Sequence, residues 1–168
     1  MKNSFKISRI QGNDIEQFKE LVELLNEVFE ESNKVASKRQ LRKLLNKSDF
    51  HAIAVIKEDK IIGGLTAYEL ERYYTDKSEL YIYDIAVKKE FHNQGIGKEL
   101  IAYLKEYSMR NGIESIFVEA HSEDEQAVKF YESTIGEGEK VDHFNLEIEA
   151  TSNTKQNNFS DDKVSRKN

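Results

Sequence analysis

Apolar positions along the first part of the chain follow two spacings, one typical of strands and one typical of helices. Over residues 4–10 they nearly alternate with polar residues, which predicts a first strand. From Asp14 to Glu30 they recur every three or four positions, which predicts a helix with one apolar face. Asn13 followed by Glu16 has the spacing of a capping box at the start of that helix.

A shorter helix and a hairpin follow. Leucines at helical spacing predict a helix over residues 38–46, with Ser37 as its cap. Two apolar runs, residues 52–56 and 61–68, flank the polar residues 58–60. This arrangement is typical of a β-hairpin with a short turn.

The second half of the chain alternates strands and helices. Residues 79–87 are rich in aromatic and β-branched side chains, which favours a strand. The same patterns predict a helix over 98–110, a strand over 115–120, a helix over 123–134 and a last strand over 140–148. The resulting order, β-α-α-β-β-β-α-β-α-β, indicates a single α/β domain.

Composition separates this domain from a polar tail. Residues 1–150 form the predicted domain, whereas residues 151–168 hold few apolar side chains and are expected to be disordered. The net charge is −6, and the tail has four basic and two acidic residues, which leaves −8 for residues 1–150. Such a body favours cationic ligands and argues against nucleic acid, although acidity also serves solubility alone.

The residue types and segments that the sequence lacks exclude several kinds of site and location. The chain has no cysteine and only 4 scattered histidines, so we expect no disulfide, no cysteine nucleophile and no metal site. It has no apolar run of about 18 residues and no signal-peptide core. We therefore expect a soluble, cytoplasmic protein that does not bind membranes.

Asp84 lies within the apolar strand 80–87. A carboxylate in such a strand is costly unless it has a partner or a function. Partial burial would raise its pKa and suit it to general-base chemistry, directly or through water, and it could also hold an ammonium group. The alternative is a structural, salt-bridged Asp. Glu79 at the strand start is a second candidate base, and Glu119 and His143 are candidates for contact with a substrate.

A glycine turn follows the same strand. Gln94-Gly95-Ile96-Gly97 leads into the helix that begins near Lys98. The first amides of a helix have no internal partners and the dipole is positive there, so this turn suits a phosphate group. The pattern matches neither the Rossmann nor the Walker motif, and simple turn chemistry is the alternative.

Two segments resemble motifs of the GNAT N-acetyltransferases. Asp84-Ile85-Ala86-Val87 and Gln94-Gly95-Ile96-Gly97-Lys98-Glu99-Leu100 are similar to the family's acetyl-CoA-binding motif, with His92 where the family prefers Gln or Arg. Ala127-Val128-Lys129-Phe130-Tyr131-Glu132 resembles a second motif of the family. The resemblance implies the GNAT fold, a mixed and mostly antiparallel central sheet with helices on both faces.

A closer resemblance is to the GNAT-type aminoglycoside 3-N-acetyltransferases. Its most distinctive segments are Ser78-Glu79-Leu80-Tyr81-Ile82-Tyr83-Asp84 and Val141-Asp142-His143-Phe144, and it spans residues 64–148. It implies an acetyl-CoA-dependent enzyme that acetylates an amine of a cationic small molecule, most simply an aminoglycoside, with a role in antibiotic resistance.

The resemblance also implies roles for individual residues. Tyr131 would protonate the leaving sulfur. In such an enzyme the candidates named above from the strand pattern would take the other roles, with Asp84 or Glu79 as the base and with Asp84, Glu119 and His143 facing the acceptor. The coenzyme would be held by Ile85, Ala86, Val87, His92, Asn93, Gln94, Gly95, Ile96, Gly97, Lys98 and Tyr131.

Two other functions fit the same residues. One is a GNAT enzyme that acetylates a peptide or protein amine or a polyamine, and the other is a non-catalytic module that binds acyl-CoA. Many GNAT proteins pair, so a homodimer is also expected by analogy, with Tyr73 and Tyr74 as candidate contacts.

Overall fold

The computed structural model describes residues 4–148 and divides the chain into two compact units, residues 1–138 and 139–168. Each unit is described by itself. The first contains all the helices and strands that the model assigns, and the predicted tail over residues 151–168 lies outside the described residues.

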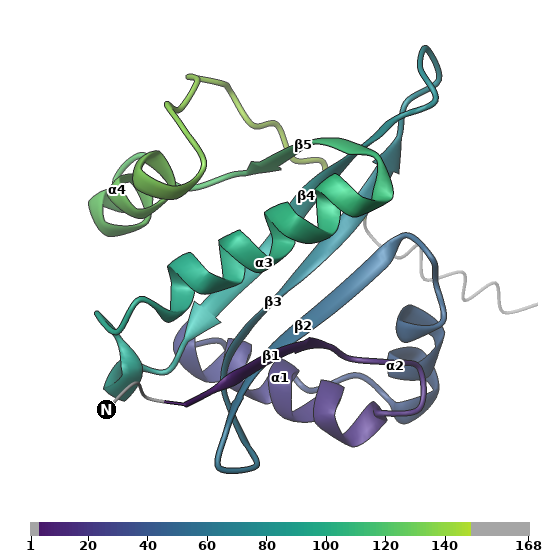
Figure 1. The fold of residues 1–168 in the computed structure, drawn as a ribbon, viewed down its shortest axis with the longest axis vertical. Helices are drawn as coiled ribbons and strands as arrows, with labels where there is room; N and C mark the ends of the chain where they lie inside the picture. Colours follow the sequence, from purple (N-terminus) through teal and green to yellow (C-terminus); the bar gives the residue numbers. More distant parts are fainter. Residues whose placement is uncertain (1–3, 149–168) are drawn as a thin grey trace, which may run out of the picture. The chain divides into compact units, whose positions relative to one another are not determined.

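A five-stranded sheet forms the centre of the first unit (Figure 1). Its strands lie in chain order, with antiparallel pairing from β1 to β4 and parallel pairing of β5 with β4. The prediction of a mixed, mostly antiparallel sheet is therefore confirmed. The strands are β1 (Lys6–Arg9), β2 (Phe50–Lys57), β3 (Lys60–Glu71), β4 (Ser78–Val87) and β5 (Ile113–Val118).

Helices cover both faces of this sheet, as predicted (Figure 1). The first face is covered by α1 (Ile15–Val28) and α2 (Lys38–Leu45), and the second by α3 (Ile96–Asn111). A 3-10 turn, η1 (Lys89–Phe91), links β4 to α3, and α4 (Glu125–Thr134) follows β5. Within residues 4–148, no helix is long and apolar enough to cross a bilayer.

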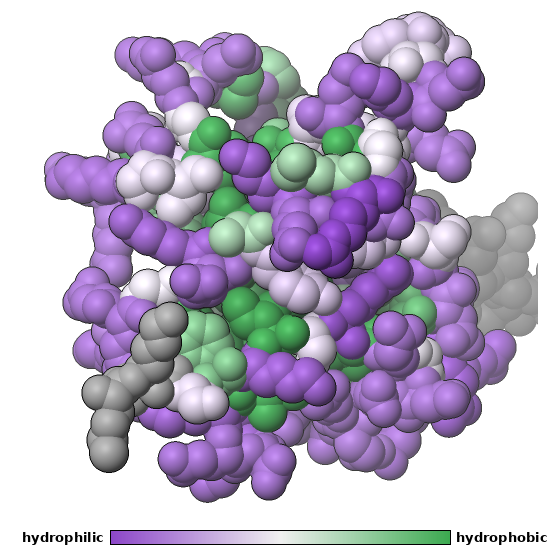
Figure 2. Space-filling view, in the orientation of Figure 1, coloured by the Kyte–Doolittle hydropathy of each residue, from purple (hydrophilic) through white to green (hydrophobic). Residues whose placement is uncertain are grey.

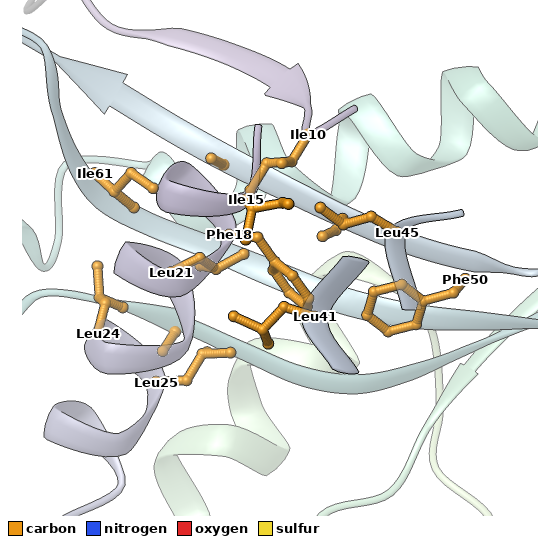
Figure 3. Close-up of a cluster of buried hydrophobic side chains, with 13 residues drawn as sticks. Ile10, Ile15, Phe18, Leu21, Leu24, Leu25, Leu41, Leu45, Phe50 and Ile61 are labelled. Carbon is orange, nitrogen blue, oxygen red and sulfur yellow. The ribbon is translucent and has the colours of Figure 1, made fainter. Parts of the chain in front are cut away.

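Two apolar layers hold the sheet and helices together. Figure 3 shows the layer between α1, α2 and the sheet, with Phe18, Leu21 and Leu41 almost fully buried. Leu100 and Leu104 of α3 are fully buried on the other face. Burying one such side chain contributes about 1.5–3 kcal/mol. On the outside, hydrophilic side chains cover most of the face over α3, and apolar ones show only in small groups (Figure 2).

An irregularity in β4 changes which side chains face each layer. Thr66 of β3 pairs with Asp84, but the next residue, Ala67, pairs with Ile82, so Tyr83 is an extra residue. This is a β-bulge. Ile82 before it and Ile85 after it both join the α3 layer. Because successive strand residues face opposite sides, Asp84 therefore faces the side covered by α1.

Two predicted features of the chain are wrong. α1 begins at Ile15 with Asp14 as its N-cap and no side-chain cap, so Glu16 stands one position too early for the predicted capping box and forms an ion pair with Lys38. Ser37, in contrast, accepts a hydrogen bond from the Gln40 amide, as predicted for a cap.

The other error concerns residues 140–148, which contain no strand. Their apolar and polar residues alternate as in a strand, but this alternation only gives the segment one apolar face that could pack on a core. A strand also needs a backbone ladder on a neighbouring strand. Val141, Phe144, Leu146 and Ile148 are instead 73–91% exposed.

Candidate active site

The parallel pair β4–β5 separates halfway along β4. Its register runs from Ser78–Ile113 to Ile82–Val118 and ends there. The second half of β4 continues beside β3 as far as Val87. Within the described part of the first unit, no strand pairs with its other edge. The separation leaves backbone groups of one strand available to a ligand.

The backbone groups at this open edge belong to Ile85 and Val87. The Lys88 amide donates to the Ile62 carbonyl of β3 at 2.9 Å, so it points to the closed edge. Alternate residues point their N–H and C=O groups to opposite edges, which turns those of Val87 and Ile85 to the open one. These are two of the residues whose backbone was predicted to hold the coenzyme.

His92 closes the turn after β4. Its Nε2 lies 2.7 Å from the Val87 carbonyl oxygen. Because a carbonyl only accepts, Nε2 carries the hydrogen and Nδ1 is left as an acceptor in the neutral ring. His92 therefore fixes the end of the open edge, and its predicted contact with the coenzyme stays a prediction.

The glycine turn has the geometry of an anion site. Gly95 is the N-cap of α3 with φ of 81°, in the left-handed region that favours glycine. A Cβ built there meets nothing within 4 Å, so the space above the turn is open. The first intrahelical bond is from the Glu99 amide to the Gly95 carbonyl, at 3.0 Å. The amides of Ile96, Gly97 and Lys98 precede it and have no intrahelical partner.

Gly97 serves helix packing. A Cβ at Gly97 would lie 3.0 Å from the Phe130 ring of α4, closer than real Cβ atoms normally approach. The absence of a side chain lets α4 pack against the first turn of α3. This brings the motif containing Tyr131 to the same region as the glycine turn.

Asp84 is the titratable group at the start of the open edge. Burial, followed by the nearby Glu31 carboxylate, raises its pKa above the ordinary value, and a hydrogen bond from Thr66 partly opposes this rise. Glu31 lies in the loop after α1, where Asn33 donates to its carboxylate at 2.6 Å. A raised pKa makes Asp84 a stronger base, which is what proton removal from an amine requires.

The Thr66 hydroxyl gives a direct test of how Asp84 is tuned. Thr66 is 6% exposed, and Thr66→Val removes the hydroxyl at similar volume. We expect the pKa of Asp84 to rise further and the acid limb of the pH–activity profile to move to higher pH. Stability should fall by about 1–3 kcal/mol above that pKa, where the charged carboxylate loses its donor, and by less below it.

The measurements are kcat/KM and urea unfolding across pH. Thr66→Ser, which keeps the hydroxyl, should restore both profiles. An unchanged profile in Thr66→Val would show that the carboxylate which limits the activity at low pH is not tuned by Thr66.

Tyr131 lies close enough to sense Asp84. Burial raises the pKa of Tyr131, and the carboxylates of Asp124 and Asp84 raise it further. The phenol therefore stays protonated at neutral pH and can donate a hydrogen bond. The structure thus places two of the predicted catalytic residues, from β4 and α4, within electrostatic range of each other.

Aromatic side chains form a cluster within electrostatic range of Asp84. Tyr83 packs edge-on against Tyr68 and Tyr81, with ring centroids 5.8 Å and 6.1 Å apart, and Tyr81 stacks on Phe117 at 4.9 Å. The Tyr81 hydroxyl donates to Glu119 at 3.3 Å. We call Tyr68, Tyr81, Tyr83, Asp84, Phe117 and Glu119 the tyrosine–carboxylate patch.

Most of the residues around Asp84 were not predicted from the sequence as parts of the site. The Tyr-x-Tyr-Asp pattern and the Phe117/Glu119 alternation were visible signals for the patch. Thr66 could have been found only from the strand register. Glu31 gave no signal, because it lies 53 positions from Asp84 in a loop without periodicity.

The structure does not bring Glu79 and His143 into contact with Asp84 within the first unit. Glu79 accepts from Arg72 at 2.6 Å, at the beginning of β4 and five residues from Asp84, which is roughly 17 Å along a strand. His143 belongs to the second unit and is exposed. Their predicted catalytic and substrate-binding roles stay predictions.

Neither described cavity includes Asp84 or the glycine turn. One, of about 810 Å³, lies at the β3–β4 loop and the end of α3, where its lining includes Arg72 and Lys77. The other, of about 510 Å³, lies beside β1 and the start of α1. Among residues 4–148 no group of three or more His, Cys, Asp and Glu side chains could hold a metal ion.

The fold, the open edge of β4 and the glycine turn define the acetyltransferases of the GNAT family, and this chain belongs to that family. A model described as the acetyltransferase (GNAT) family matches residues 18–136. The predictions of a GNAT fold and of an N-acetyltransferase are confirmed. The family uses acetyl-CoA.

Similar solved structures come from uncultured soil metagenomic samples. The aminoglycoside acetyltransferase meta-AAC0020, solved with trehalose, is 40% identical with a TM-score of 0.83 over 86% of this chain and 97% of that one. The structure of meta-AAC0020 with sisomicin is 39% identical in sequence, with a TM-score of 0.84. It also covers 86% of this chain and 97% of that one. A second aminoglycoside acetyltransferase, HMB0005, is 34% identical with a TM-score of 0.82 over 87% of this chain and 99% of that one. A comparison with curated proteins found no match.

Proposed function

We propose that this protein is an acetyl-CoA-dependent N-acetyltransferase that acts on an amine of an aminoglycoside, at the 3-N position. The observation that carries the proposal is the place of Asp84, at the bulge where β4 loses its β5 neighbour. A base at this point belongs to the tyrosine–carboxylate patch and stands at the start of the open strand edge. The resemblance to aminoglycoside acetyltransferases at 34–40% identity supports the substrate class.

The residues present fit coenzyme A. The diphosphate would be held by the amides of Ile96, Gly97 and Lys98, where Gly95 leaves open space. The backbone of Ile85 and the Val87 amide would pair with the pantetheine arm, as a neighbouring strand would, while the Val87 carbonyl accepts from His92. When bound, acetyl-CoA supplies a thioester whose acetyl group passes to the amine.

Asp84 prepares the amine. An aminoglycoside ammonium must lose a proton before its nitrogen can attack, and the Asp84 carboxylate accepts that proton directly or through one water. Its raised pKa, from burial and then Glu31, strengthens it as a base. The surrounding carboxylates, Glu31 and Glu119, favour a ligand with several positive charges.

Tyr131 would serve the leaving group, the thiolate of coenzyme A. Because its pKa is raised, the phenol keeps its proton at neutral pH and is available as a donor to a thiolate. A phenol is a weaker acid than a thiol, so complete transfer is uphill and a strong hydrogen bond to the sulfur is the main contribution.

A panel of amines tests this function. We expect acetyl-CoA-dependent thiol release with sisomicin, and much slower release with spermidine and with a peptide that has a free N-terminus. NMR of the product would establish which nitrogen is acetylated. The absence of turnover with any aminoglycoside would refute the proposed substrate class.

Two variants separate catalysis from mere binding. A non-catalytic acyl-CoA-binding module would bind coenzyme A but show no turnover. For an enzyme, Asp84→Asn and Tyr131→Phe should each reduce thiol release while calorimetric affinity for coenzyme A stays the same.

A further inference from the structure

The β-bulge in β4 gives Tyr83 an unusual position. The bulge inserts Tyr83 between the paired positions Ile82 and Asp84, so the ring is displaced from the regular alternation of the strand. Contacts with Tyr68 and Tyr81 hold the ring in place at centroid distances of 5.8 Å and 6.1 Å. Tyr83 is nevertheless 60% exposed. A ring that is held on two sides but left open is suited to contact a ligand.

Tyr83 is part of a continuous series of ring contacts. Phe50 of β2 packs against Phe18 at 5.6 Å and against Tyr68 at 5.1 Å. Tyr68 contacts Tyr83, and on the far side Tyr81 stacks on Phe117 with an interplanar angle of 21°. The exposed rings therefore rest on the buried core between α1 and the sheet, and little side-chain entropy is left to lose when a ligand contacts them.

Charge surrounds the same rings. The pKa of Tyr81 is raised by burial and then by Glu119, with smaller contributions from Tyr83 and Asp84. The pKa of Tyr68 is raised by burial, by Tyr83 and by Asp84. The rings thus lie within electrostatic range of two carboxylates, and their negative faces add to the attraction for an ammonium group.

Resting on the proposed function, we infer that Tyr83 is a specificity-determining residue that packs against the ring of a cyclic amino sugar while Asp84 holds its amine. An amino sugar ring presents C–H groups on one face and ammonium and hydroxyl groups at its edge. The face matches the exposed rings, and the edge matches Asp84 and Glu119. A linear polyamine has the charges but no such face.

The inference is tested by calorimetric titration of sisomicin and of spermidine, without coenzyme A, into the parent protein and three variants. Tyr83→Ala should weaken sisomicin binding about 5–10-fold, which corresponds to about 1–1.4 kcal/mol, while spermidine binding changes less than about twofold. Tyr83→Phe keeps the ring and should bind both amines like the parent. Tyr73→Ala removes a fully exposed tyrosine of the β3–β4 loop as a matched control.

The parent protein tests the proposed function, and the variants test the role of Tyr83. If the parent does not bind sisomicin, the proposed function and this inference both fail. If the parent binds sisomicin but Tyr83→Ala loses no affinity, or loses both amines equally, only the role of Tyr83 is overturned. Far-ultraviolet circular dichroism and the melting temperature identify a variant that has not folded, in which case Tyr83→Leu replaces Tyr83→Ala as the ring-less variant.

Discussion

Asp84→Asn is expected to lower kcat/KM for sisomicin by about 10²–10⁴-fold, the range that general-base catalysis contributes. Asn keeps the shape of Asp84 and can accept a hydrogen bond from Thr66, but it cannot take a proton from the amine. The fall should appear mainly in kcat, and the residual rate should lose the acid limb of its pH profile. Steady-state thiol release across pH measures both.

The same variant should be at least as stable as the parent at neutral pH. Because burial and Glu31 raise the folded-state pKa of Asp84, its stabilising contribution is complete below the unfolded pKa and is lost as pH rises through the folded pKa. Asn resembles the neutral carboxyl at every pH. The gain in melting temperature should therefore be present near pH 7 and shrink toward about pH 4, near the ordinary pKa of Asp.

Asp76→Asn provides a control for the loss of one acidic charge. Asp76 is exposed in the β3–β4 loop, outside the proposed site. It should leave kcat/KM within about twofold of the parent, the scale expected of a distant surface charge. Parent-like turnover in Asp84→Asn would exclude Asp84 as the base.

Gly95→Val is expected to weaken binding of coenzyme A by more than about 10-fold, a loss above about 1.4 kcal/mol. A Val at φ of 81° is strained by about 1–2 kcal/mol, and its branched side chain would stand in the space above the amides of Ile96 and Gly97. Calorimetry with coenzyme A measures the affinity, and thermal unfolding measures the strain.

Gly112→Val separates these two effects. Gly112 caps the other end of α3 with φ of 72°, and a Cβ there also meets nothing within 4 Å. The two variants place Val in the left-handed region at opposite ends of one helix, so both carry backbone strain of the same kind. Equal losses of affinity in both would mean that the glycine turn does not hold the diphosphate.

The sequence was most informative where periodicity alone determines structure. β4 and α3 were predicted within a few residues because their apolar positions repeat over ten residues or more. The strand predicted over 140–148 failed although its alternation was similar. Strand formation depends on a partner ladder, and no local pattern encodes where that partner lies.

The site was predictable only in part. Asp84, Tyr131 and the glycine turn could be located because each interrupts a pattern or belongs to a recognisable motif. The bulge at Tyr83 could not, because the strand pattern gives no sign that one residue is extra. The effect of Glu31 on Asp84 depends on the fold of a loop, and the ion pair of Glu79 with Arg72 depends on how the chain turns between β3 and β4, so the sequence pattern gave neither.

The early end of the β4–β5 ladder has a consequence for handling the protein. Unsatisfied backbone groups along a sheet margin can recruit the margin of another molecule and start self-association. A ligand whose amides satisfy those groups would shield the margin and, by mass action, favour the native state. Adding coenzyme A to storage and crystallisation buffers would thus cover the open margin of this sheet and reduce self-association.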